Sequence, residues 1–257
     1  MGHYYFVVPS LPPLSLLDLP EITFSELMVR LETCLSRKDL EKVKTLRLFI
    51  DICNIRSLLM EEPVDPRGNL GEKELDESLL IQTALPDYVF EFLGQFEKVS
   101  DKIRNFPGLL ALFFNREIEN QEGFLKSYFQ FEREWRLVLA ALRAKQLGRD
   151  IAKELQFEEP TEPLVAQILA QKDSDRYDPP MEYNDLKELV STSYADPWLQ
   201  QAAFVEYRFH KIADMTHAAA FSIDQILSYV AQLMLVEDKN ALDAERGKMI
   251  LDTFKSG

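Results

Sequence analysis

The chain is poor in glycine and cysteine. Only 9 of its 257 residues are glycine, and together with abundant Leu, Ala, Glu and Lys this scarcity favours helices over turns and strands. The two cysteines, Cys34 and Cys53, match neither a zinc-ligand spacing nor a disulfide framework. Since we recognise no secretory signal, we expect free thiols in a reducing cytoplasm. These absences predict an all-α protein.

Basic residues are also in short supply. Lysine and arginine number 29 against 43 aspartate and glutamate residues, which gives a formal charge of −14. Such an acidic surface repels nucleic acid and anionic lipid headgroups. The longest basic cluster, at Arg37, Lys38, Lys42 and Lys44, is interleaved with acids and is typical of a solvated helix face. We therefore expect no nucleic acid among the partners.

A long uninterrupted apolar run is missing as well. Residues 4–8 are aromatic and β-branched, and three prolines follow within five positions, so we expect a short N-terminal strand there. The most apolar long segment, 218–236, contains Asp224, Gln225 and Gln232. These polar residues favour a buried helix over a membrane span. We expect no direct insertion into a membrane.

The common signatures of catalysis do not occur. The sequence has neither a glycine-rich phosphate loop nor a G-x-S-x-G elbow. Two of its 3 histidines, His210 and His217, could share a helix face with Glu206 and Asp214. A di-metal carboxylate bundle requires two Glu-x-x-His motifs, however, and Asp214-x-x-His217 has no second copy. We expect no cofactor, no metal and no catalytic residue.

What the sequence does contain is helical periodicity, most clearly in residues 129–157. This stretch has no proline, a single glycine, and an apolar face that recurs with a period near 3.6 residues. Its largest apolar side chain, Trp135, is the expected core anchor beside Val138, Leu139 and Leu142.

Part of this stretch recurs at a constant offset of 103 residues. The identical pairs are Glu134/Glu237, Leu139/Leu242, Ala141/Ala244, Arg143/Arg246 and Lys145/Lys248. Within each copy the acid and the arginine lie about two and a half helical turns apart, so they project from opposite sides of one helix. We therefore expect each side chain to have a structural partner on a neighbouring element.

Local signals place several helix starts. Residues 23–26 (TFSE) form a capping box, and residues 36–39 open a second, longer helix. Ser222 is the expected N-cap of a helix over 223–236, and a last helix is expected over 239–254.

Three segments interrupt the helical pattern. They are rich in proline and charge and cover residues 61–76, 157–161 and 171–183. The first is expected to bury little. The interpretation is one all-helical chain, 1–257, with sub-bundles near 20–80, 85–170 and 182–257.

Two segments resemble motifs of the C subunit of V-type rotary ATPases, which is called subunit d in eukaryotes. Residues 131–151 resemble the family's segment with an acid near its start and R-x-K further on, here Glu134, Arg143 and Lys145. The family's C-terminal pattern is matched by Phe221, Ser222, Tyr229, Glu237, Asn240, Gly247 and Lys248. Residues 4–14 are similar to the opening of a bacterial branch of proteins encoded beside V-type ATPase subunits.

This resemblance implies a fold of three similar helical bundles arranged as a funnel. It also implies a non-catalytic rotor part on the cytoplasmic face of the membrane ring, where it receives the end of the central shaft. The partners would be the shaft subunits and the ring, and the protein would be a monomer in isolation. Passing torque demands stiffness and complementary surfaces rather than reactive groups.

Two alternatives stay open at this point. A helical-repeat adaptor unrelated to any ATPase would have the same helices and the same acidic surface. A helical-bundle metalloenzyme would use His210, His217 and nearby carboxylates. A rotor part should be encoded among genes for other rotary-ATPase subunits, whereas an adaptor need not be. Purified protein without stoichiometric iron, manganese or zinc would exclude the metalloenzyme.

Overall fold

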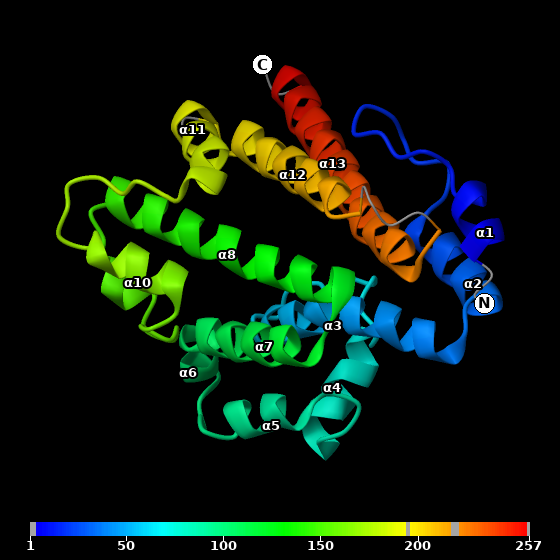
Figure 1. Cartoon of the computed structure of the whole chain (residues 1–257), viewed down its shortest axis with the longest axis horizontal. Helices are drawn as coiled ribbons and strands as arrows, with labels where there is room; N and C mark the ends of the chain where they lie inside the picture. The colour runs from blue at the N-terminus through cyan, green and yellow to red at the C-terminus, as the bar shows by residue number, and fades with distance from the viewer. Residues whose placement is uncertain (1–3, 194–195, 217–220, 256–257) are drawn as a thin grey trace. The chain divides into compact units, whose positions relative to one another are not determined.

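Every regular element in the described part of the chain is a helix, which confirms the all-α prediction (Figure 1). The computed structural model describes residues 4–193, 196–216 and 221–255, with side chains as far as Arg246. The chain forms two compact units. Unit 1 comprises Met1–Leu35, Glu134–Gln156 and Pro160–Gly257, and unit 2 comprises Ser36–Arg133 and Phe157–Glu159. The three sub-bundles expected from the sequence stay a prediction.

Unit 1 contains most of the C-terminal helices, including α13, the longest helix of the described residues. The elements of this unit are α1 (Tyr4–Val7), η1 (Val8–Ser10), α2 (Phe24–Cys34), α9 (Ile151–Glu154), α10 (Pro163–Ala170), η2 (Met181–Tyr183), α11 (Asn184–Ser193), α12 (Pro197–Asp214) and α13 (Ile223–Lys255). The helix α8 (Gly123–Gln146) contributes its second half.

The prediction of an N-terminal strand is wrong. Residues 4–10 form a helical turn and a 3-10 turn instead, closed by a 2.6 Å hydrogen bond from Ser10 Oγ to Val7 O. The described residues include no strand with which this segment could pair, so its backbone groups bond locally. The Tyr229 hydroxyl then holds the segment by donating to Pro12 O at 2.8 Å.

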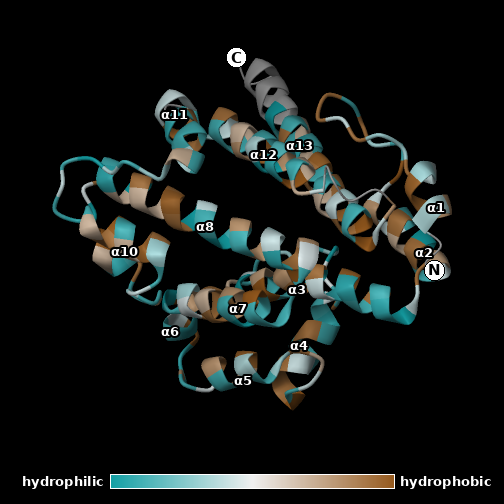
Figure 2. Cartoon of the chain, viewed as in Figure 1, coloured by the Kyte–Doolittle hydropathy of each residue, from teal (hydrophilic) through white to brown (hydrophobic). Residues whose placement is uncertain are grey.

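The pair α12 and α13 forms the core of unit 1, and the two helices lie side by side in Figure 1. From Ile226 to Val236 most side chains of α13 are buried, and Figure 2 shows apolar residues interspersed with polar ones along α13. Two polar side chains within it are satisfied by the backbone of α12. Ser228 Oγ donates to Ile212 O at 3.2 Å, and Gln232 Nε2 donates to Phe209 O. A helix buried in this way needs such partners for its polar groups.

Helix α13 runs without interruption through the predicted break between residues 236 and 239. Ser222 Oγ accepts a hydrogen bond from Gln225 N, so the predicted start is confirmed. The segment Glu237-Asp238-Lys239 contains neither glycine nor proline, and nothing in it forces the helix to end.

Helix α8 ends eleven residues before the predicted stretch 129–157 does. Its last residue is Gln146, and Gly148 follows with a φ of +63°. This left-handed conformation is accessible to glycine and terminates helices. Arg149 N then donates to Ala144 O at 2.8 Å, which closes the end of the helix.

Unit 2 is built around α3. Its elements are α3 (Arg37–Leu59), α4 (Glu72–Ile81), α5 (Asp87–Leu93), α6 (Val99–Arg104), α7 (Phe106–Asn120) and the first half of α8. Ser36 caps α3 by accepting from Asp39 N, and the box of Thr23 and Glu26 caps α2 in unit 1, so both predicted starts are confirmed.

The segment 94–108 connects three helices of unit 2. Helix α5 stops at Gly94, and α6 begins at Val99. Pro107 lies in the first turn of α7, where a missing N–H costs nothing. A Cβ on Gly108 would lie 2.9 Å from Phe157 and 3.1 Å from Phe92, so glycine allows α7 to pack closely there.

The interior of unit 2 is aromatic. Phe113 contacts Phe49, Phe114 and Phe129 with ring centroids 5.2–5.6 Å apart. Two of these contacts are edge-to-face, an arrangement that adds about 0.5–1.5 kcal/mol per pair beyond the buried area.

One carboxyl group is buried beside this core. Glu117 is only 7% exposed, and it accepts hydrogen bonds from the Tyr88 hydroxyl at 3.3 Å and from Gln121 Nε2 at 3.2 Å. Burial raises the pKa of Glu117 above its ordinary value, although both hydrogen bonds oppose the shift. Folding therefore favours the protonated form.

Glu117→Gln should stabilise the protein at neutral pH. A raised folded pKa means that the contribution of Glu117 to stability is full below its unfolded pKa and is lost as pH rises through the folded pKa. Glutamine keeps an acceptor for Tyr88 without a charge. We expect the variant to gain in urea midpoint at about pH 7 and to lose that gain at about pH 3. Glu119→Gln, at an exposed position of α7, is the control. An equal change in both variants would contradict the prediction.

Candidate functional site

The first copy of the repeated motif, with Glu134, Arg143 and Lys145, lies in α8. Its side chains form hydrogen bonds to other elements of unit 1. The Glu134 carboxylate accepts a 2.5 Å hydrogen bond from the Tyr183 hydroxyl of η2. Burial raises the pKa of Tyr183, and the Glu134 carboxylate raises it further, so the phenol stays a proton donor. This contact ties η2 to α8.

The two basic residues of this copy have partners on other elements. Arg143 Nη2 donates to Gln200 Oε1 at 3.0 Å, and its guanidinium lies 5.5 Å from the centre of the Phe204 ring. Burial lowers the pKa of Arg143. Lys145 Nζ donates to the carbonyl oxygens of Lys172 and Ser174, in the segment after α10. Both side chains therefore hold neighbouring parts of unit 1.

The second copy lies in α13. Glu237 Oε1 accepts a 2.7 Å hydrogen bond from Phe24 N, at the first residue of α2. Arg246 lies 3.7 Å from Asp196, whose side chain caps α12. The buried Nδ2 of Asn240 has no hydrogen-bond partner among the described residues. The Lys248 side chain lies outside the described residues.

The two copies share one structural role. Glu134 and Glu237 occupy equivalent positions in the aligned stretches, and each accepts a hydrogen bond from a distant element: Glu134 from the last residue of η2, and Glu237 from the first residue of α2. Neither acid is paired with the arginine of its own copy. A carboxylate that accepts a backbone N–H at a helix start also complements the helix dipole, as Glu237 does for α2.

Trp135 lies between α8 and α12. It is 7% exposed, and its ring centroid is 5.9 Å from that of Phe204. The guanidinium groups of Arg136 and Arg208 lie 4.9 and 5.5 Å from the ring centre. Stacked guanidinium groups add cation–π attraction to the apolar contact.

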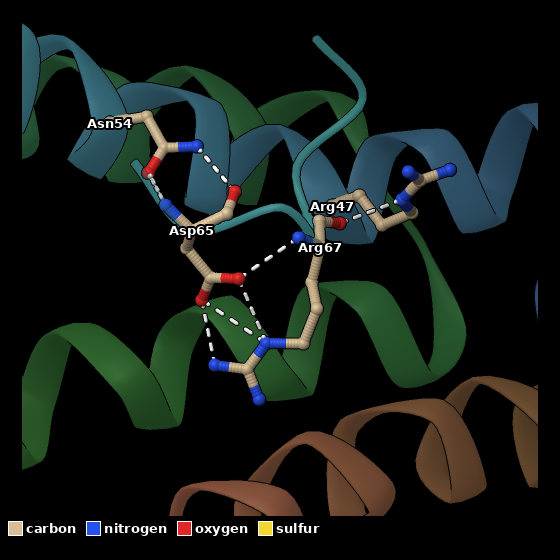
Figure 3. A network of polar contacts seen from close by, with 4 residues as sticks. All are labelled: Arg47, Asn54, Asp65 and Arg67. Carbon is tan, nitrogen blue, oxygen red and sulfur yellow. Dashed lines mark hydrogen bonds and ion pairs between the residues drawn. The ribbon is translucent and has the colours of Figure 1, made fainter. Parts of the chain in front are cut away.

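The structure also shows a site in unit 2 that the sequence interpretation missed. Arg47, Asp51 and Asn54 share one face of α3 and hold the segment 65–70 against the helix, as Figure 3 shows for Arg47 and Asn54. We call this arrangement the polar clamp. The break at 61–76, expected to bury little, is anchored here.

Within the polar clamp, the side-chain amide of Asn54 hydrogen-bonds to both backbone groups of Asp65, as a paired strand would. Its Nδ2 donates to Asp65 O at 2.9 Å, and its Oδ1 accepts from Asp65 N at 2.8 Å. Arg47 donates to the carbonyl oxygens of Arg67 and Gly68 at 2.9 and 2.5 Å. These bonds give the backbone groups of the segment partners on α3.

The pKa values of the two carboxylates in the polar clamp, Asp51 and Asp65, shift in opposite directions. Asp51 is 1% exposed, and burial raises its pKa even though Leu70 N and Asn69 Nδ2 donate to it. Burial acts in the same direction on Asp65, but the hydrogen bonds and charge of Arg67, at 2.6 Å, lower the pKa overall. Asp51 thus fixes the end of the segment at Leu70, whereas the Asp65 carboxylate holds Arg67 within the segment.

A spacing in the sequence could have revealed the polar clamp. Positions 47, 51 and 54 follow a helical period, and Asp51 and Asn54 interrupt the otherwise apolar face of α3. A polar residue at a core position requires a hydrogen-bond partner nearby.

We searched the described residues for side chains that could bind a metal ion. No group of three or more His, Cys, Asp and Glu side chains in the described ranges could hold a metal ion. His210 lies 4.0 Å from Glu206 at an exposed position, and His217 lies outside the described residues. Among the described helices, none is both long and apolar enough to cross a membrane.

The comparisons place the chain in a family. A family model described as "Protein of unknown function (DUF2764)" matches residues 1–257. The chain belongs to this family. It is 28% identical to an uncharacterized protein of Chlamydia pneumoniae over 258 residues, which cover 98% of this chain and 97% of the relative. A Chlamydia muridarum relative with the same description is 26% identical over 263 residues, covering 100% and 99%. No solved structure matches.

Because the DUF2764 match spans the whole chain, it includes both copies of the motif and the polar clamp. The family description itself assigns no activity to these residues. The interpretation of the site therefore depends on its geometry.

Trp135→Ala should destabilise the protein by about 3–5 kcal/mol, because removing a large buried aromatic side chain leaves a cavity. The loss of two stacked guanidinium contacts adds to this cost. Urea unfolding followed by far-UV circular dichroism measures the effect. Trp198→Ala, in the more exposed first turn of α12, should cost less. An unchanged midpoint would instead make Trp135 a candidate for partner contact.

Gly68→Ala should destabilise unit 2 by about 1–3 kcal/mol, the usual cost of overpacking. A Cβ there would lie 2.5 Å from Asp51 Oδ1 and 3.0 Å from Asn54 Nδ2, so the polar clamp would have to shift. Gly71→Ala is the matched control, since its Cβ would meet nothing closer than 3.6 Å. Gly71 is the N-cap of α4, where alanine is less favourable than glycine, so this variant should lose about 0.5–1 kcal/mol, less than Gly68→Ala. Equal unfolding midpoints for the two variants would rule out the steric argument.

Proposed function

We propose that the protein is a non-catalytic central-stalk subunit of a V-type ATPase or ATP synthase. In this role it couples the central shaft to the membrane rotor ring. The observation that carries the proposal is the shared role of Glu134 and Glu237. Both belong to the stretches that resemble the motifs of the C subunit, and both brace a second element of unit 1.

Stiffness supports this role, because a part that passes torque must not bend. Helix α13 has 33 residues and α8 has 24, which correspond to lengths of about 50 and 36 Å. In unit 2 the ion pair of Arg133 and Glu158, at 2.5 Å and nearly buried, fixes the segment after α9. Removing one partner of a buried pair costs about 3–5 kcal/mol, so such a contact resists deformation.

The charge of the chain supports a basic surface on at least one partner. With a formal charge of −14, long-range attraction should speed association with a basic shaft or ring subunit and weaken as salt screens the field. Apolar contacts should supply most of the affinity, since exposed ion pairs contribute only about 0–1 kcal/mol each. In this proposal the protein is a monomer alone and lies at the inner face of the membrane through the complex.

Co-purification with shaft and ring subunits of the same organism tests the proposal. We expect the tagged protein to retain at least one of them at low salt, to associate more slowly at moderate salt, and to hydrolyse no ATP alone. Glu237→Gln serves as a variant that keeps an acceptor for Phe24 N and should bind normally.

Retention of neither subunit at either salt, together with retention of an unrelated protein, would favour the helical adaptor over the rotor part. Stoichiometric iron, manganese or zinc in the purified protein would favour the metalloenzyme. Either result would replace the proposed function.

A further inference from the structure

A groove opens in unit 2 where the end of α3 meets α4, α5 and α6. Its volume is about 470 Å³, which falls in the ~300–1,000 Å³ range of binding pockets. The apolar lining consists mainly of Leu58, Leu59, Leu79, Phe90, Leu93 and Phe96. Apolar residues are visible in α4 and α5 in Figure 2. We call this the α3–α6 groove.

Exposed aliphatic side chains border the α3–α6 groove. Leu80 is 76% exposed and Val99 is 49% exposed, and both line it. Met60 and Ile81, next to lining residues in the chain, are exposed as well. Single exposed apolar residues are common on proteins, but a cluster around a concave apolar surface is typical of a binding site.

The backbone at two edges of the groove is held in an uncommon conformation. Glu61 and Gln82 both line the groove and have φ values of 59° and 55°. Non-glycine residues rarely adopt this left-handed conformation. These turns end α3 and α4 abruptly, so neither helix extends across the groove.

The surroundings of the groove are strongly acidic. The segments 58–62, 72–82, 87–94 and 95–104 contain ten Asp and Glu residues against four Lys and Arg residues. Among the lining residues themselves, Glu61 and Asp76 stand against Lys102. A ligand of this groove must therefore combine an apolar surface with positive charge.

We propose that the α3–α6 groove docks an amphipathic helix of a partner protein. The helix places a row of aliphatic side chains in the groove and carries lysine or arginine side chains beside that row. The charge argues for this occupant over two others. An anionic lipid surface is repelled by the acids, and a second copy of the chain brings the same excess of acids. The inference concerns unit 2 alone and does not depend on the proposed rotor function.

A synthetic peptide tests this docking site directly. The probe is a fluorescently labelled helix of about 18 residues, with leucines spaced three and four apart and lysines flanking them. A second peptide has glutamate in place of every lysine. Fluorescence anisotropy with the full-length protein should give saturable binding of the lysine peptide and binding at least about tenfold weaker for the glutamate peptide.

Variants locate the binding on the protein. Leu80→Glu and Val99→Glu should each weaken binding of the lysine peptide about tenfold or more, because each places a charge in the apolar groove. Leu17→Glu is the matched control, since Leu17 is 91% exposed and belongs to unit 1. All three positions are exposed, and unchanged circular-dichroism melting curves would show that the variants fold.

Several results would overturn the inference. They are equal affinity for both peptides, equal affinity of Leu80→Glu and Leu17→Glu, or no saturable binding. Two further measurements cover the other occupants. Binding to anionic vesicles that Leu80→Glu abolishes would assign the groove to lipid, and a dimer in analytical ultracentrifugation that Leu80→Glu dissociates would assign it to a second copy.

Discussion

Side chains of the long helices hold several connecting segments in place through hydrogen bonds to their backbone groups. Asn54 pairs with both backbone groups of Asp65, Lys145 donates to two carbonyl oxygens after α10, and Tyr229 holds the N-terminal segment. The described part of the chain has no strand that could supply such partners. Leaving a buried polar group without a partner costs about 1–3 kcal/mol, so the part-buried contacts of Asn54 and Tyr229 help to fix where their segments lie.

This dependence gives the motif residues a physical meaning. Glu134, Lys145 and Glu237 each form a hydrogen bond to another element of unit 1, so each of them has a structural role. A role in bracing fits a protein whose task is mechanical, and this is the link between the geometry and the proposed central-stalk function. The same bracing would also serve a rigid adaptor, which is why binding to named partners decides the matter.

The two units carry different features. Unit 1 contains both copies of the motif, together with the aromatic and guanidinium stack at Trp135. Unit 2 contains the polar clamp and the α3–α6 groove. The acidity of the chain acts on both in the same way, since it favours basic partners and disfavours lipid and nucleic acid.

The sequence by itself determined the helical class and the local helix starts. Low glycine content, 3.6-residue periodicity, the box at Thr23 and Glu26, and the cap at Ser36 all act within a few residues, so a local pattern suffices to predict them. The acidic charge is likewise a property of composition alone.

The tertiary structure decided what these local patterns could not. Residues 4–8 have strand propensity but fold as helix, since no neighbouring strand is present among the described residues. The role of Asp51 depends on Leu70, and that of Glu237 depends on Phe24, 213 residues away in the chain. The tight space at Gly68 exists only once α3 and the following segment have met. A hydrogen bond or a steric contact between distant residues is a property of their spatial approach, and no period within one segment encodes it.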